Sequence, residues 1–225
     1  MPRAEDFDYR LDGSWDAARM GEQEQQDLQA GRSGIRVGWA GVPWLSLGVA
    51  QRGVEALRQR AHSGGVEVHP RSTGGTAVLI SPGDLLFSLV LRRTHPLAAS
   101  PVTKGYGRLG AGACRFLERF RIRGEWSAPA GLSDLFCPLG ALGSPLRADG
   151  RVLGGAAQHL TGTHVLHHGF LFRSLDRLLL GRLFGLSASV LSNELTSLSE
   201  LGIPAEPPQQ AAQLLDAWSS IIDSS

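Results

Sequence analysis

A bend at residues 70–75 carries the first side chains that could do chemistry, with Arg71 followed closely by Thr73, Gly74 and Gly75. The glycine pair lets the backbone turn with positive φ and lets a ligand approach the main chain. Arg71 offers a planar fork that suits a carboxylate or a phosphate. The same pattern is also typical of an ordinary turn between two strands, with Arg71 as a solvated charge at its rim.

The two cysteines, Cys114 and Cys137, are read as free thiols rather than as a disulfide. Cys137 lies in residues 128–147, a segment rich in Pro, Gly and Leu that we expect to be a long loop, and such loops are often functional. Cys114 falls on the apolar side of a predicted helix, where burial raises the pKa of a thiol. As the alternative, Cys137 beside Phe136 could be a small buried apolar residue.

Four histidines follow within ten positions, which raises the question of a zinc site: His159, His164, His167 and His168. His164 and His167 are three residues apart and cannot share one face of a strand. No cysteine or carboxylate lies close to them in sequence. We therefore expect hydrogen-bonded or surface histidines and no metal.

The elements that must position these residues alternate irregularly along the chain. We expect strands at residues 35–39, 44–49, 66–69, 76–80, 85–91, 122–126, 151–158 and 165–172. We expect helices at residues 14–29, 53–63, 106–120, 175–183, 193–202 and 209–222, after a loose lead-in over residues 1–12. This order is not a βα repeat, so the sequence predicts an α+β fold with a mixed, mainly antiparallel sheet flanked by helices.

Residues 105–110 read GYGRLG and fit the dinucleotide-binding pattern of three glycines. That pattern should follow a strand directly, and here a loop containing proline precedes it. We therefore reject a nucleotide-binding role for this segment.

The bend resembles the signature of the biotin/lipoate protein ligase family, which reads Arg-Arg-x-Thr-Gly-Gly-x-Ala-Val and continues with a His and a Pro-Gly-Asp-Leu turn. The matching residues are Arg71, Thr73, Gly74, Gly75, Ala77, Val78, Pro82, Gly83, Asp84 and Leu85. Pro70 stands in place of the first Arg, and Ile80 in place of the His. The resemblance implies the fold of class II synthetases and biotin ligases, in agreement with the predicted α+β class.

The second half of the chain resembles the Cys-dependent octanoyltransferases of that family. They carry Gly-Arg-Lys-x-x-Gly-Ser-Ala-Gln after a loop cysteine and before a His-Gly segment, and residues 150–158 here read GRVLGGAAQ. The resemblance implies that Cys137 accepts the acyl group and that His168 orients the substrate or acts as a base. The catalytic lysine of the family falls at Val152, because Gly155 and Ala157 align without a shift of register.

The sequence thus predicts a transferase that moves an octanoyl or lipoyl group onto a lysine of a carrier protein through Cys137. The acyl pocket would be formed by Arg71, Thr73, Gly74, Gly75, Ala77, Val152, Gly155 and Ala157. The partner would be an acyl carrier protein or a lipoyl-domain protein. No tightly bound cofactor is expected, since the octanoyl or lipoyl group is the substrate.

Two alternatives remain open at this point. A non-catalytic relative could bind an acyl chain, an acyl carrier or a lipoyl domain, because Pro70, Ile80 and Val152 each replace a polar family residue by an apolar one. An ATP-dependent lipoate ligase could instead use Arg71 and the glycine pair to hold phosphate. Loss of the lysine weakens the ligase alternative more, since an adenylate requires positive charge.

The composition of the chain limits which functions and which cellular locations we expect. The 225 residues carry a net charge of +1, which gives no overall field for nucleic acid or a membrane. Residues 1–10 lack the apolar core of a signal peptide, so we expect a cytoplasmic protein with one domain over residues 1–225 and a short helical C-terminal tail from about residue 190. Of the 22 Lys and Arg residues only Lys104 is a lysine, so a mechanism that needs a tunable ammonium has one candidate.

Overall fold

Two β-sheets form the centre of this computed structural model, which describes residues 7–49, 51, 53–98, 102–126, 143–204 and 206–225. The strands are β1 (Asp8–Trp15), β2 (Gly34–Ala40), β3 (Trp44–Leu47), β4 (Glu67–Pro70), β5 (Val78–Ile80), β6 (Leu85–Arg92), β7 (Gly124–Trp126), β8 (Gly143–Ala148), β9 (Arg151–Leu160) and β10 (His164–Leu171). The helices are α1 (Ala17–Ala30), α2 (Glu55–Ser63), α3 (Val102–Leu109), α4 (Ala111–Glu118), α6 (Arg177–Phe184), α7 (Ala188–Glu194) and α8 (Pro207–Ile222).

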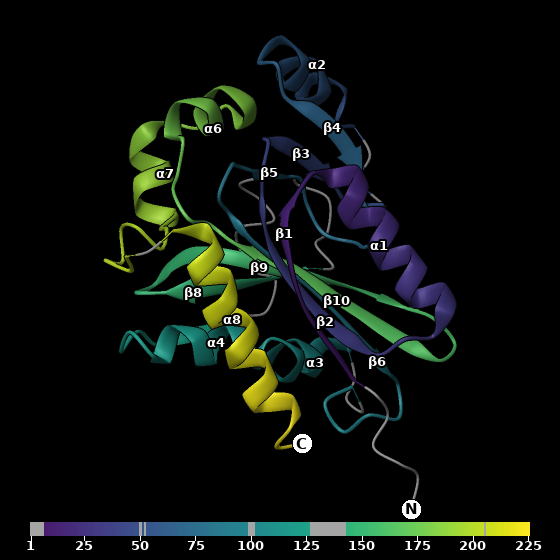
Figure 1. Ribbon diagram of the computed structural model, residues 1–225. Coiled ribbons are helices and arrows are strands. Elements are labelled where there is room, and N and C mark those ends of the chain that lie inside the picture. The colour runs from purple at the N-terminus through teal and green to yellow at the C-terminus, as the bar shows by residue number, and fades with distance from the viewer. Residues whose placement is uncertain (1–6, 50, 52, 99–101, 127–142, 205) are drawn as a thin grey trace, which may run out of the picture.

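The larger sheet has seven strands in the order β1-β2-β6-β10-β9-β8-β7. Its neighbours are antiparallel except for the parallel pair β1 and β2. The smaller sheet has the order β4-β3-β5, with β3 and β4 parallel. Helices flank both sheets (Figure 1). The predicted α+β class with a mixed, mainly antiparallel sheet is therefore confirmed.

The main core lies between the larger sheet and helices α3, α4 and α8. Strand β6 reads LLFSLVLR, and every residue except the last is buried, as expected for a central strand covered on both faces. Helix α8 contributes Trp218, which is fully buried beside Phe87 with ring centroids 5.7 Å apart. The end of the chain is thus packed into the main core, since α8 contacts α4, β1 and β2.

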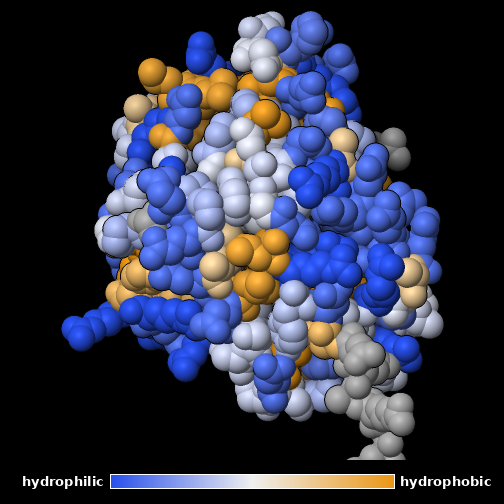
Figure 2. All heavy atoms as spheres, in the orientation of Figure 1, coloured by the Kyte–Doolittle hydropathy of each residue, from blue (hydrophilic) through white to orange (hydrophobic). Residues whose placement is uncertain are grey.

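A second core joins the smaller sheet to helices α2, α6 and α7. Its buried members include Leu45, Leu79, Val152, Phe172, Leu180 and Leu191. Arg60 of α2 donates a hydrogen bond of 2.6 Å to the carbonyl of Leu183, which ties α2 to α6. On the face drawn in Figure 2, apolar side chains gather at the upper left, over α6.

Two expectations for the first half of the chain are wrong. The lead-in predicted for residues 1–12 contains strand β1 from Asp8 onward, which pairs with β2 at the edge of the larger sheet. The helix predicted at residues 106–120 is divided at Gly110, because the Trp126 indole packs on this glycine and donates a 2.9 Å hydrogen bond to its carbonyl. The rejected three-glycine segment lies in α3 and at the start of α4, and not in a strand-to-helix turn.

Two expectations for the second half also need correction. The predicted loop at residues 128–147 ends in strand β8, while residues 127–142 lie outside the described part of the chain. The helix predicted at residues 193–202 is absent, because α7 ends at Glu194 and Leu195 is extended. Leu195 forms a parallel bridge with Val152, and the Thr196 amide donates a 2.9 Å hydrogen bond to the Val152 carbonyl. Pairing with β9 thus replaces the local preference for a helix.

No helix in the described part of the chain is long and apolar enough to cross a membrane.

Candidate functional site

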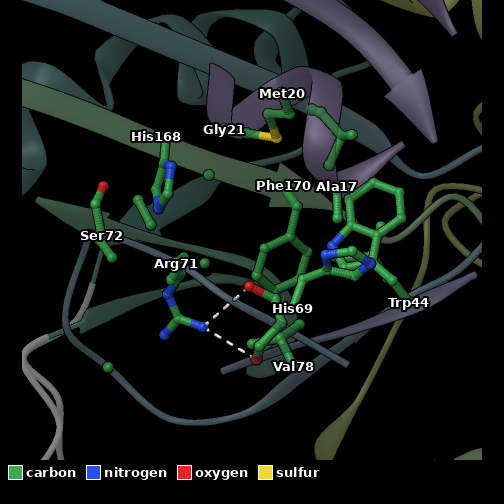
Figure 3. Close-up of a pocket in the computed structure, with 18 of the residues that line it drawn as sticks. Ala17, Met20, Gly21, Trp44, His69, Arg71, Ser72, Val78, His168 and Phe170 are labelled. Atoms are coloured by element: carbon green, nitrogen blue, oxygen red, sulfur yellow. Dashed lines mark hydrogen bonds between the residues drawn. The ribbon is translucent and has the colours of Figure 1, made fainter. Parts of the chain in front are cut away.

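A cavity of about 660 Å³ lies between α1, the smaller sheet and strands β9 and β10. Its size is within the range typical of small-molecule sites. The larger apolar side chains that line it include Trp44, Val78, Leu79, Ile80, Phe170 and Phe172. Figure 3 shows Phe170 and Trp44 at its centre, with Arg71 and His168 pointing in from different segments.

Seven of the residues selected from the sequence line this cavity: Arg71, Gly75, Ala77, Val152, Gly155, Ala157 and His168. Thr73 and Gly74 are buried beside the cavity and are not part of its lining. Cys137 lies outside the described residues. Among these seven residues, the cavity brings together segments that are up to 97 positions apart, from Arg71 to His168.

The bend at residues 70–75 is held by the segment that follows β3. The Val49 amide donates a 2.9 Å hydrogen bond to the Thr73 carbonyl. Gly75 has a φ of +92°, a conformation that side chains disfavour. Gly48 is required for another reason, since a Cβ at Gly48 would lie 2.1 Å from the Gly75 carbonyl oxygen. The sequence indicated the two glycines of the bend, but it did not indicate that Gly48, which faces Gly75, is also required.

The Arg71 guanidinium is fully engaged by the protein itself. Nε donates to the Thr73 hydroxyl and to the Gly74 carbonyl, both at 3.1 Å. Nη2 donates to the carbonyls of Gly74 at 2.7 Å and Thr76 at 2.8 Å. Nη1 donates to the Ser46 carbonyl at 3.1 Å and to its hydroxyl at 3.2 Å. All five donors are thus used, and the fork expected to hold a carboxylate or phosphate instead shapes the bend.

Burial lowers the pKa of Arg71 to about 10, and the nearby Glu24 carboxylate opposes this effect. The guanidinium therefore stays charged at neutral pH, and Glu24 is its electrostatic counterpart across the cavity.

His168 links this bend to helix α1. Its Nε2 lies 2.7 Å from the Thr73 hydroxyl oxygen, and its Nδ1 lies 2.7 Å from Glu24 Oε1. The Glu24 carboxylate can only accept, so His168 Nδ1 carries a hydrogen, and Nε2 of the neutral imidazole accepts the Thr73 hydroxyl hydrogen. His168 then donates its Nδ1 hydrogen to Glu24. A directed chain runs from Arg71 through Thr73 and His168 to Glu24, and its two ends carry opposite charges.

The sequence-based reading missed Glu24, which is 5% exposed within a strongly polar helix. Met20 and Leu28 lie four residues before and after Glu24, and all three side chains line the cavity. An acidic residue on the inward stripe of a surface helix was the signal that could have found it. A buried carboxylate without a partner is costly, so this position implied a partner across the fold.

Val152 lines the cavity, and its neighbour Arg151 points away from it. A register shift between Leu146 and Arg147 of β8 inserts one extra residue into β9 after Val152. Val152 is 6% exposed and packs in the second core. Arg151 lies 3.6 Å from Glu200 on the outside. No described residue places a lysine side chain in this lining.

Beyond the bulge, β9 and β10 present small residues and His168 on the same side. Gly155 pairs with Phe170, and Ala157 pairs with His168. A Cβ at Gly155 would lie 3.4 Å from Cε1 of Phe170, so Gly155 and the Phe170 ring are close neighbours in this wall. Small residues on β9 therefore keep the cavity open beside His168.

His167 points to the opposite side of the sheet, into the main core. Its ring lies among the rings of Phe87, Tyr106 and Trp126, with centroids 5.8 to 6.0 Å away. Burial lowers the pKa of His167 to about 3, and His168 adds to the effect. His167 is thus a neutral core residue. The described residues contain no group of three or more His, Cys, Asp or Glu side chains that could hold a metal ion.

Cys114 lies half-buried on α4, away from the cavity. Burial raises the pKa of its thiol to about 11, and Glu118 adds to the effect. Cys114 is therefore a poor nucleophile at neutral pH.

A curated protein is similar to this chain in sequence. The octanoyltransferase LipM of Macrococcus caseolyticus (strain JCSC5402) is 26% identical over 149 residues, which cover 62% of this chain and 53% of LipM. The chain thus spans about half the length of this curated relative.

Two solved structures share the fold at low identity. Protein Ta0514 of T. acidophilum, with bound lipoic acid, aligns with a TM-score of 0.71 at 16% identity, over 96% of this chain and 86% of that one. A bipartite lipoate protein ligase from Thermoplasma acidophilum, described with its E2 lipoyl domain, aligns with a TM-score of 0.69 at 14% identity, over 97% and 84%. The model of the lipoyl protein ligase A/B catalytic domain matches residues 26–218, and the chain belongs to that family.

Proposed function

We propose that this protein transfers an octanoyl or lipoyl group from a carrier thioester to a lysine of an acceptor protein, with Cys137 as the intermediate acyl carrier. The observation that carries the proposal is the character of the cavity. Its lining is largely apolar, and its described arginine, Arg71, has every donor engaged by the protein. Such a cavity favours an uncharged acyl chain.

The energetics favour the acyl chain as ligand. Each buried CH₂ contributes about 0.8 kcal/mol, so seven methylene or methyl carbons of an octanoyl group supply roughly 6 kcal/mol. Phe170, Phe172 and Leu79 offer the apolar contacts. In the proposed reaction the Cys137 thiolate attacks the thioester carbonyl, the carrier thiol leaves, and the acceptor amine then takes the acyl group.

In this scheme His168 orients the site and does not act as the base. Both of its ring nitrogens are engaged, one by Thr73 and the other by Glu24. Their hydrogen bonds fix the imidazole and hold the bend against β10. Of the two roles considered from the sequence, this geometry favours orientation.

The ATP-dependent ligase is supported less well. An acyl-adenylate brings a phosphate that requires donors or positive charge. Arg71 has no donor to spare, and Val152 stands where the family has its lysine. One observation favours the non-catalytic alternative. Val152 makes the wall of the cavity apolar at the position where the resemblance places the catalytic lysine. This alternative requires the acyl cavity but no reactive thiol.

Incubation with octanoyl-acyl carrier protein, followed by intact mass measurement, tests the proposal. The wild type and Cys114→Ser should gain one octanoyl group that hydroxylamine removes, and Cys137→Ser should gain none. A parallel incubation with octanoate, ATP and Mg²⁺ should give no acylation. Binding of the acyl carrier without a covalent adduct would favour the non-catalytic alternative, and acylation that requires ATP would favour the ligase.

A further inference from the structure

Glu24 presents a second carboxylate oxygen that the hydrogen-bond chain does not use. Its Oε1 accepts from His168 at 2.7 Å. None of the hydrogen bonds found among the described residues involves Oε2, and the side chain, 5% exposed, lines the cavity. A carboxylate oxygen in a largely apolar wall is a strong acceptor that the protein itself leaves incompletely satisfied.

We propose that Glu24 Oε2 receives the amine of the acceptor lysine. This inference rests on the proposed function and names the residue that admits its second substrate. The lysine side chain is a long apolar stem with a cationic end, which matches an apolar cavity that contains one buried carboxylate. Met20 and Leu28, on the same stripe of α1, would contact the stem.

The surroundings of Glu24 also favour loss of a proton from the bound amine. A low-dielectric site disfavours the charged ammonium, and the Arg71 guanidinium adds a like charge at the other end of the chain. Transfer of one proton from the ammonium to Glu24 replaces a desolvated ion pair by a neutral amine and a neutral carboxyl group, while the charge of Arg71 is unchanged. The neutral amine has the free electron pair that attack on the acyl carbonyl requires.

The proton balance follows from this arrangement. The ammonium gives one proton to Glu24, and the neutral nitrogen attacks the carbonyl carbon of the acyl thioester. The C–N bond forms and the C–S bond breaks, with its electron pair leaving on sulfur. A second proton passes from nitrogen to that sulfur, so an amide, a thiol and a protonated Glu24 result. His168 keeps the Glu24 carboxyl oriented throughout.

Glu24→Gln tests the inference, because it keeps the shape of the side chain and removes the charge. Glu55→Gln, at an exposed glutamate of α2 outside the cavity lining, is the matched control. In the first experiment each protein is acylated by octanoyl-acyl carrier protein and then discharged either by a lipoyl domain or by hydroxylamine, which is neutral near pH 7. Glu24→Gln should slow discharge by the lipoyl domain about tenfold or more. Discharge by hydroxylamine should be unchanged.

Equal lipoyl-domain discharge by Glu24→Gln and Glu55→Gln would overturn the inference while leaving the proposed function intact. Absence of acylation in the wild type would instead contradict the proposed function. A second experiment, calorimetric binding of n-octylammonium and of octanamide, then decides the role of Glu24 without any transfer. Glu24→Gln should bind octylammonium about tenfold more weakly than the wild type. It should bind octanamide equally well, which also shows that the cavity is folded. Unchanged octylammonium binding would overturn the inference.

Discussion

His168 Nδ1 lies 2.7 Å from Glu24 Oε1, although the two residues are 144 positions apart in the chain. This contact joins the central strand β10 to helix α1 across one wall of the cavity. Through Thr73 and Arg71 it continues into the bend that carries the family signature. The most specific sequence motif of the chain is therefore positioned by a glutamate that lies outside it.

The Val152→Lys variant should transfer acyl groups faster than the wild type. Desolvation in this apolar wall would lower the pKa of the new ammonium, and in either protonation state the nitrogen could donate to the acyl carbonyl. One such donor contributes about 3 kcal/mol to transition-state stabilisation, or roughly a hundredfold in rate. Rates with octanoyl-acyl carrier protein measure the effect, and Val152→Met controls for side-chain size. Rapid wild-type transfer that the lysine does not improve would show that another group performs this role.

Thr73→Val should lower the free energy of unfolding by about 1 to 3 kcal/mol, because it leaves His168 Nε2 and Arg71 Nε without their shared partner. The two side chains are nearly equal in volume, so packing is retained. Thr73→Ser keeps the hydroxyl and should be close to wild type. Urea unfolding at neutral pH compares the three proteins. Equal stability of the valine and serine variants would mean that the chain from Arg71 to Glu24 contributes little.

His167 should make the protein sensitive to acid. The pKa of His167 is lowered from 6.5 to about 3 in the folded state, so between these values the unfolded chain binds a proton that the folded chain excludes. This contribution is fully present above pH 6.5 and is lost as the pH falls towards 3. The wild type should lose about 3 kcal/mol more stability than His167→Leu between about pH 7 and about pH 4. Parallel stability curves for the two proteins would contradict a neutral buried His167.

Gly48→Ala should disturb the bend, since the new methyl group would lie 2.1 Å from the Gly75 carbonyl oxygen. Backbone must move to relieve this contact, so both stability and binding of octanamide should fall. Gly107→Ala is the matched control, because a methyl group on this helical glycine would meet no other atom within 4 Å. That substitution should stabilise α3 by up to about 1 kcal/mol. Thermal unfolding measures the stability of both variants, and calorimetry measures their binding of octanamide.

Patterns that depend on near neighbours in the chain were readable from the sequence. The buried run of β6, the glycine pair of the bend and the small residues of β9 all reflect local backbone geometry and strand period, and they predicted the strands correctly. The family resemblance rested on these same segments, which is why the family and the α+β class could be predicted. Spacing along the chain predicted Val152 in the wall of the cavity, and the extra residue in β9 brings Val152 and Gly155 into the same lining.

The state of each polar group was decided only by tertiary structure. From the sequence, Arg71 could have been a free guanidinium, and Glu24 could have been an exposed charge on a polar helix. In the folded protein the donors of Arg71 are engaged by protein acceptors, and Glu24 is buried. Residues 195–202 follow the same rule, since pairing with Val152 replaces the predicted helix. Hydrogen bonds and burial at these positions join segments tens of residues apart. Their energies outweigh local preferences of a few tenths of a kcal/mol per residue, so the partners of these groups were decided by tertiary structure.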